Sequence, residues 1–578
     1  MNWIGKRVDG EAGAPRLWRP LSRRQFLSAL ATTGAVLSAG GLLSACTPAA
    51  PASPAPTTAP QSGATAPTSP PVAAAAAPTT APTTAPAVAK QAVTLVVGIP
   101  EAITNPDPVI LGQAGYGDAK AITDNINEGL LRYKPGTVEV EPALAESWDV
   151  SSDGLTYTFH IRPNVKFHDG TPVNAEAVKL NYDRQTDEKN PYHFQGITYT
   201  EIVFGDVDRV EVSGERDLKI TMKRPTVQLL GNLAMYVEGM VSPAALQKYG
   251  NDYSQHPIGT GPFKFDHWTK DVEFAMVAND DYWGGRPKVD KVVFRTIKDN
   301  TVRLQELRAA SIDVTTELDL KDVDSVKSSA DLQTINGSFL DTQYIGMNTV
   351  LAPFDNVKVR QAVQYAINKQ NIAKALFYGN YTLGAGPIHP SLPGYDGSLQ
   401  SVYTYDPAKA KQLLADAGLS SGFQLELLTR SEGIWPLEVQ LVQADLAAIG
   451  ANVTVKQMDS AAFYDQINAS KGQIFLNDWV YDTGDPDNIM FSVFSSPRAR
   501  SRLGYNSPEE DKLNLAAQTE RDANKRIDLY KQAQKILLQD SPMVFLGYPA
   551  RIMGAKKGIA NLKVSPIGSL PLGGVTVG

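Results

Sequence analysis

Residues 47–89 divide the chain, because this stretch cannot form a folded core. It contains no charged residue and 11 of the 39 prolines, and most of its other positions are Ala, Thr or Ser. A segment with so few large apolar side chains cannot bury enough surface to offset the entropy of ordering it. We therefore predict a disordered linker over residues 47–92, with folded structure only beyond it.

Residues 1–46 have the composition of an export signal rather than of a domain. Residues 1–24 carry a net charge of +4, and a weakly apolar Ala/Gly/Leu stretch follows them. The region ends at Cys46, the one cysteine of the chain. A single cysteine excludes an intrachain disulfide framework and any thiolate-rich metal site, so Cys46 needs another role.

Two short patterns suggest that role. Arg23 and Arg24 within SRRQFL resemble a twin-arginine export signal, and LSAC at residues 43–46 resembles the lipobox of bacterial lipoproteins. Cys46 would then be the acylated first residue of the mature chain, held stably on a membrane by several acyl chains. The alternative is an uncut transmembrane anchor. We predict an extracytoplasmic protein, lipid-anchored to the cell membrane on its periplasmic or cell-surface side.

The remainder of the chain is acidic. Residues after 24 carry a net charge of −11 without long Lys/Arg runs, which argues against a nucleic-acid partner. Apolar periodicity predicts a mixed α/β body from about Val93 to Gly578. Val93–Pro100 reads as a buried strand, and Val359, Ala362, Val363, Ala366 and Ile367 form the apolar stripe of a helix.

The sequence gives no sign of catalysis or of a bound metal. It lacks a G-x-S-x-G elbow, an H-E-x-x-H helix and a Walker loop. No two of its six histidines lie within four residues of each other. Gly259-Thr260-Gly261-Pro262 reads as a tight turn that positions Phe263 in a core. We predict a protein that is not an enzyme and holds no cofactor, although a glycosidase carboxylate pair cannot be recognised by spacing.

Several motifs carry a family resemblance. The segment from Phe159 to Pro172, FHIRPNVKFHDGTP, resembles the hallmark stretch of the family 5 extracellular solute-binding proteins, the peptide, dipeptide and nickel receptors of ABC importers. Four further segments follow in the family's order: GTGPF at 259–263, NDDYW at 279–283, VRQAVQYAINK at 359–369 and YDPAKA at 405–410.

This resemblance implies a two-lobed α/β fold of the periplasmic-binding-protein type II, with a hinge between the lobes and an extra subdomain in the first. We expect the first lobe at residues 93–297 plus 545–578, its subdomain near 136–210, and the second lobe at 298–544. The implied partners are a small peptide and the membrane subunits of an ABC permease, bound by a monomer. Alternatives are another solute of the family, such as a nickel chelate, opine or oligosaccharide, or a secreted hydrolase on a stalk.

The candidate ligand site is the polar stretch from Trp479 to Asn488. On chemistry alone, its aspartates could simply cap backbone N–H groups in a turn. Peptide-binding members of the family hold the ligand's α-ammonium with an aspartate three residues before an acidic-Pro pair, and Asp482 occupies that place before Asp485. We name Asp482, Asp485, Trp479 and Tyr481 as ligand-binding candidates. Nickel-receptor relatives have a histidine just after the acidic-Pro pair, whereas this chain has Asp487, so no metal is expected.

A fifth candidate is Arg430. Dipeptide-binding relatives use an arginine after a second-lobe strand to hold the ligand carboxylate, and Arg430 matches that place if the alignment takes a gap. A surface arginine is the alternative. The pocket tryptophan of those relatives has no match in Asp459–Tyr464, which leaves ligand length and side-chain preference open.

Overall fold

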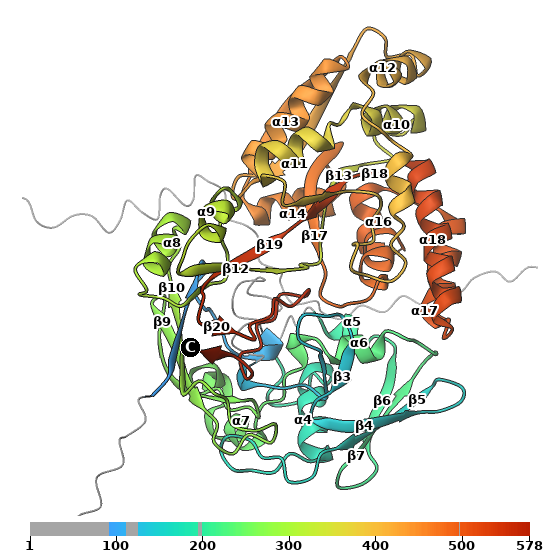
Figure 1. The fold of residues 1–578 in the computed structure, drawn as a ribbon. Helices are drawn as coiled ribbons and strands as arrows, with labels where there is room; N and C mark the ends of the chain where they lie inside the picture. Colours follow the sequence, from blue (N-terminus) through green and yellow to red (C-terminus); the bar gives the residue numbers. More distant parts are fainter. Residues whose placement is uncertain (1–91, 111–124, 195–198, 496) are drawn as a thin grey trace, which may run out of the picture. The chain divides into compact units, whose positions relative to one another are not determined.

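The computed structural model describes residues 92–110, 125–194, 199–495 and 497–578. The chain divides by its contacts into Met1–Ala87 and Val88–Gly578, and the described residues lie in the second unit. Arg23, Arg24 and Cys46, like the predicted linker, therefore fall outside the described residues. The unit Val88–Gly578 is a mixed α/β body built on two large sheets (Figure 1).

The first sheet is centred on β1 (Thr94–Ile99), which runs parallel to both of its neighbours, β10 and β11. Leu95, Val97 and Ile99 are fully buried, which confirms the strand predicted from Val93–Pro100. The strand order is β12-β19-β11-β1-β10-β9-β8. The other strands are β8 (Phe263–Thr269), β9 (Glu273–Ala278), β10 (Lys291–Thr296), β11 (Val314–Thr315), β12 (Leu332–Gly337) and β19 (Arg551–Lys556).

The second sheet has helices on both faces. Its strands, in the order β14-β18-β13-β17-β15-β16, are β13 (Asp341–Met347), β14 (Tyr381–Leu383), β15 (Phe423–Arg430), β16 (Ala451–Met458), β17 (Ile474–Val480) and β18 (Met543–Pro549). One face packs on α10 (Val357–Ala366), α11 (Lys369–Phe377) and α13 (Trp435–Ala448). The predicted apolar stripe of α10 is buried there, which confirms it. On the opposite face, Phe463 of α14 (Ser460–Asn468) contacts Phe475.

The chain passes from the first sheet to the second between β12 and β13 and returns between β18 and β19. These crossings define a first lobe on the first sheet and a second lobe on the second sheet. The boundaries expected at 297/298 and 544/545 are wrong, because β11 and β12 belong to the first sheet and β18 belongs to the second. A two-residue strand such as β11 is recognisable only by its pairing with β1 and β19.

A separate four-stranded sheet forms the extra subdomain of the first lobe, with the order β4-β5-β7-β6. Its strands are β4 (Ala145–Val150), β5 (Thr156–Ile161), β6 (Val207–Val212) and β7 (Asp217–Met222), so the subdomain continues past the predicted end near residue 210. The helix α4 (Ala175–Thr186) packs on this sheet. Asn174 caps α4, because its side chain accepts a hydrogen bond from the backbone N–H of Ala177.

Short elements complete the body: β2 (Leu131–Tyr133), β3 (Val140–Pro142), α5 (Thr200–Phe204), α6 (Leu229–Leu233), η1 (Tyr236–Glu238), α7 (Pro243–Tyr249), η2 (Gly250–Gln255), α8 (Asn300–Arg308), η3 (Leu320–Asp322), α9 (Val323–Lys327), η4 (Gly397–Ser401), α12 (Pro407–Asp416), α15 (Asp487–Ile489), η5 (Met490–Ser495), α16 (Pro497–Leu503), α17 (Pro508–Thr519), α18 (Ala523–Asp540), β20 (Ile559–Ala560) and β21 (Thr576–Val577). Of the helices in the described part of the chain, none is both long and apolar enough to span a membrane.

The turn before β8 depends on glycine. Phe263, just after it, is fully buried in the core of the first lobe, as the sequence predicts. A Cβ added at Gly259 would lie 2.1 Å from the carbonyl O of Ile126, and one added at Gly261 would lie 2.4 Å from that of Asn125. Both obstacles are backbone atoms, which cannot move aside as a side chain can.

We therefore expect Gly259→Ala to lower the free energy of unfolding by about 1–3 kcal/mol, because overpacking at this position forces a backbone shift. Urea denaturation measures the change. The matched control is Gly574→Ala, where an added Cβ meets no atom within 4 Å and stability should be nearly unchanged. Equal losses in the two variants would contradict the steric explanation.

Candidate functional site

The polar loop that follows β17 lies where the second lobe meets the first. Asp482 is 5% exposed, and its Oδ1 accepts a hydrogen bond of 3.0 Å from the hydroxyl of Tyr199. Tyr199 in turn accepts one from the Tyr236 hydroxyl at 3.2 Å. Both tyrosines belong to the first lobe, so a buried carboxylate of the second lobe is held by a tyrosine from the opposite lobe.

Gly484 makes a second contact between the lobes. Its backbone N–H donates to the hydroxyl of Tyr133 at 3.0 Å, and that hydroxyl donates to the carbonyl O of Gly231 at 3.0 Å. A Cβ at Gly484 would lie only 2.6 Å from Cβ of Val138. The loop thus approaches the first lobe at a point where a side chain would not fit.

Tyr481 and Trp479 support this loop from within the protein. The ring of Tyr481 is fully buried, and its hydroxyl donates to the carbonyl O of Pro387 at 2.8 Å. Trp479 donates from Nε1 to Oδ1 of Asn488 at 2.9 Å, which ties the strand to the far end of the loop. Tyr481 was named as a ligand-binding candidate, and its hydroxyl is held by the protein itself.

Asp485, another ligand-binding candidate, also has its carboxylate held within the protein. Its carboxylate makes a bidentate ion pair with Arg526 of α18, with both N–O distances 2.7 Å, and accepts from the backbone N–H of Asp487 at 2.8 Å. Burial and the neighbouring Asp485 raise the pKa of Asp487 to about 7. This part of the loop is the aspartate-capped turn that the sequence left as the alternative.

Arg430 ends β15, and the protein itself already supplies partners to it. Its Nη2 donates to Oδ1 of Asp478 at 2.7 Å, and its guanidinium lies 4.1 Å from the ring centroid of Trp435. The side chain is 13% exposed. Nε is buried and has no hydrogen-bond partner among the described residues. Arg430 is thus neutralised by Asp478 but retains one N–H without an acceptor.

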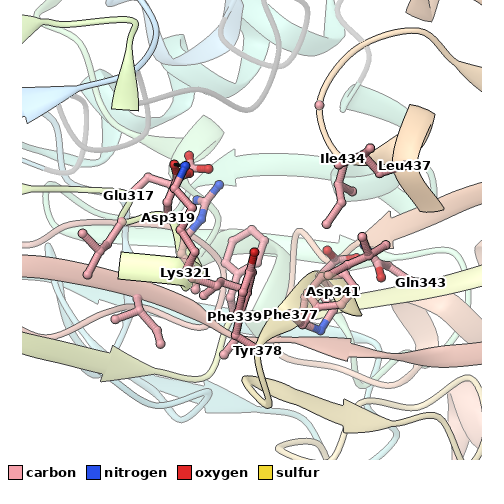
Figure 2. A pocket seen from close by; sticks show the side chains of 18 of the residues that line it. Glu317, Asp319, Lys321, Phe339, Asp341, Gln343, Phe377, Tyr378, Ile434 and Leu437 are labelled. Carbon is pink, nitrogen blue, oxygen red and sulfur yellow. Dashed lines mark ion pairs between the residues drawn. The ribbon is translucent and has the colours of Figure 1, made fainter. Parts of the chain in front are cut away.

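A cavity of about 640 Å3 lies beside the two crossings, and we call it the hinge cavity (Figure 2). The first lobe contributes residues 317–321 and the start of β19, and the second lobe contributes residues 375–378 and 433–435. Phe339, Asp341, Gln343, Leu437 and Asp478 also line it. Figure 2 shows Lys321 and Asp319 on one side of this space and Ile434 and Leu437 on the other.

Carboxyl groups concentrate beside the hinge cavity. Burial raises the pKa of Asp341 well above its usual range, and the neighbouring Asp478 raises it further. Burial also raises the pKa of Glu438, which lies in α13 and is fully buried, to about 8. Three of these carboxyl oxygens lack a hydrogen-bond partner among the described residues: both oxygens of Glu438 and Oδ1 of Asp341.

The sequence analysis did not identify Tyr133, Tyr199, Asp341 or Asp478. The contact between Tyr199 and Asp482 joins residues 283 positions apart, and no local pattern reports such a pair. Asp341 and Asp478 did leave a signal, because each stands in a strand that is otherwise mainly apolar or uncharged. Within the described ranges, no group of three or more His, Cys, Asp or Glu side chains is placed to hold a metal ion.

Comparison with known proteins gives consistent similarities. The model of the bacterial extracellular solute-binding proteins, family 5 Middle, matches residues 139–501. The dipeptide-binding protein of Escherichia coli K12 is 32% identical over 517 residues, which covers 83% of this chain and 93% of that protein. Heme-binding protein A of Haemophilus influenzae is 32% identical over 484 residues, covering 79% and 88%.

A solved structure agrees with these relatives. The ABC transporter-associated periplasmic binding protein DppA from Helicobacter pylori, in complex with the peptide STSA, superposes with a TM-score of 0.73 at 29% identity. The match covers 84% of this chain and 98% of that one. The two-lobed fold expected from the sequence is thereby confirmed.

The buried carboxyl of Glu438 predicts a pH dependence of stability. Its pKa is raised from 4.5 when unfolded to about 8 in the folded protein, so the folded state retains a proton that the unfolded state has lost. This contribution is fully present below pH 4.5 and is lost as the pH rises through about 8, at up to about 1.4 kcal/mol per pH unit.

Glu438→Gln should therefore flatten the decline in unfolding free energy between pH 5 and about 8.5, measured by urea denaturation across that range. Glu139→Gln is the control, because the Glu139 side chain is 70% exposed and its removal should leave the slope unchanged. Identical slopes in wild type and Glu438→Gln would show that Glu438 ionises normally in the folded protein.

Proposed function

The chain belongs to the bacterial extracellular solute-binding proteins of family 5, and from this we propose that it captures small peptides for an ABC importer by closing its lobes around them. The closed form delivers the peptide to the membrane subunits of the importer. Members of this family bind their solute rather than convert it, so the peptide is released unchanged.

The observation that carries this proposal is the position of Asp482. A peptide α-ammonium enclosed between two lobes loses its water and needs a carboxylate partner. Asp482 is buried at the lobe contact, on a loop held rigidly by Trp479, Tyr481 and Asp485. A charge-assisted hydrogen bond there contributes about 1.5–3 kcal/mol. The similarity to a dipeptide-binding protein and to a peptide-bound structure supports this reading.

Arg430 is the proposed partner of the peptide carboxylate. Its side chain is 13% exposed, and a guanidinium has five N–H donors, which leaves donors that a carboxylate can use. Asp478 already holds Nη2, so a ligand carboxylate has to share the guanidinium with it. This competition favours peptides whose affinity comes chiefly from the ammonium end.

Other solutes of the family are the alternative, and the similarity to heme-binding protein A keeps it open. A thermal-shift screen against di- to pentapeptides, sugars, heme and Ni2+ separates the classes, because a ligand that binds only the folded form raises its melting temperature.

We further propose that residues 1–46 direct export through Arg23 and Arg24, that Cys46 carries the lipid anchor, and that residues 47–92 tether the body to the membrane. Over residues 47–89 of this tether, an extended polyproline geometry gives a span of about 130 Å, and a flexible coil gives about 36 Å. The body can therefore move relative to the membrane while its lipid anchor stays in place.

Asp482→Asn should weaken binding of an unmodified peptide by about 10- to 100-fold, because the charge is lost while an oxygen remains for Tyr199. The N-acetylated form of the same peptide should lose little, since it carries no ammonium. Isothermal titration calorimetry measures both. Equal losses for the two peptides would remove Asp482 from the amine site.

Tyr199→Phe is the matched control for that experiment. It removes the hydrogen bond between the lobes and leaves the carboxylate. We expect it to weaken both peptides by the same factor, about two- to tenfold, because it acts on lobe closure rather than on the ammonium.

Cys46→Ser should release the protein from the membrane fraction into the soluble extracytoplasmic fraction, because no acyl chain can be attached. Arg23→Lys with Arg24→Lys should instead leave the unprocessed chain inside the cell. Fractionation with detection of the acyl group measures both, and a membrane-bound Cys46→Ser protein would show that the anchor is an uncut helix.

A further inference from the structure

We propose that the hinge cavity is a second binding site, distinct from the peptide site, and that it takes an organic cation: an ammonium carried on a compact apolar body. Its volume of about 640 Å3 lies within the range of about 300–1,000 Å3 that small-molecule sites occupy.

Acidic residues outnumber basic residues in the lining of the hinge cavity. Its acidic residues are Glu317, Asp319, Asp341 and Asp478, and its basic residues are Lys321 and Arg551. Lys321 pairs with Asp319 at 3.0 Å, and Asp478 pairs with Arg430. The guanidinium of Arg551 lies 4.2 Å from the ring centroid of Phe339.

Asp341 is the group that lacks a partner. It is 7% exposed, its Oδ1 has no hydrogen-bond partner among the described residues, and it lines the cavity (Figure 2). Oδ1 is closed off from the cavity, so a ligand ammonium meets the carboxyl at its exposed part and makes a charge-assisted hydrogen bond there. Glu438, close behind, adds a second carboxyl without a partner among the described residues.

The rim of the cavity supplies the apolar part of the site. Tyr378 is 58% exposed and Leu437 is 56% exposed, and both line the cavity. Tyr378 lies at the end of α11 and Leu437 near the start of α13, and both helices belong to the second lobe. The apolar part of a ligand bound between these two side chains is removed from water, which favours binding. The ring of Tyr378 also attracts the positive charge of the ligand.

The alternation of side chains along the strands separates this site from the peptide site. Along β13, Asp341 and Gln343 share a face with Ile345, which packs on α10, α11 and α13. Thr342 lies on the opposite face, where its hydroxyl is 3.3 Å from that of Tyr481. The cavity and the loop of Asp482 thus occupy opposite faces of the second sheet, and Arg430 borders the cavity through its contacts with Trp435 and Asp478.

The experiment uses three probes of nearly equal shape: phenethylammonium, 2-phenylethanol and 3-phenylpropionate. We measure their affinities for the full-length protein by isothermal titration calorimetry. We expect phenethylammonium to bind at least about tenfold more tightly than the other two, because its positive charge alone favours the ionised form of the Asp341 carboxyl and pairs with it. Similar affinities for all three, or no binding of phenethylammonium, would overturn the proposal.

Four variants locate the bound probe. Asp341→Asn should weaken phenethylammonium by about tenfold or more, and Leu437→Arg should do the same by placing a cation on an exposed part of the rim. Asp208→Asn on β6, 49% exposed in the extra subdomain, is the control for charge and should have no effect.

Asp482→Asn distinguishes the two sites. If phenethylammonium is lost in Asp482→Asn and retained in Asp341→Asn, the amine occupies the peptide site and the second site does not exist. If Asp341→Asn loses the amine and Asp482→Asn retains it, the second site stands whether or not peptides are the ligand at Asp482.

Discussion

The two crossings between the sheets are the constraint on which the rest of this structure depends. They run side by side, because β12 pairs with β19 on one side of them and β13 pairs with β18 on the other. A paired connection of two strands permits one lobe to rotate against the other while it resists separation. Asp341 and Arg551 of the hinge cavity lie on strands that enter or leave this connection, and Asp482 follows β17, which pairs with β13.

Burying a carboxylate at such a contact is unfavourable unless a cation pairs with it. The buried acids of this protein fall into two groups. Asp485 is neutralised by Arg526, and Asp478 by Arg430, so these acids stabilise the second lobe. Asp341 and Glu438 have raised pKa values and carboxyl oxygens that find no hydrogen-bond partner in the described part of the chain. Burial keeps an acid of the second kind protonated, and an incoming cation favours its ionised form.

Much of the scaffold could be predicted from sequence, because its signals are local. The strand at Val93–Pro100, the apolar stripe of α10 and the Asn174 cap each depend on neighbouring residues. The roles of polar residues were harder to predict. The loop around Asp482 looked equally rich in candidates at every aromatic and acidic position, and only long-range contacts show that Tyr481 and Asp485 are held by the protein. Lobe boundaries failed for the same reason, since the short β11 is defined by partners far along the chain.

The hinge connects the two proposed sites energetically. Lys321 and Trp435 face the same cavity from different lobes, as Tyr199 and Asp482 do at the lobe contact. A rotation that separates Tyr199 from Asp482 therefore also changes the distance between the cavity walls. A solute that binds one arrangement of those walls more tightly shifts the equilibrium between open and closed lobes, and the peptide must change the affinity of that solute by the same factor. The hinge cavity is thus placed where a cation can adjust peptide capture without contacting the peptide.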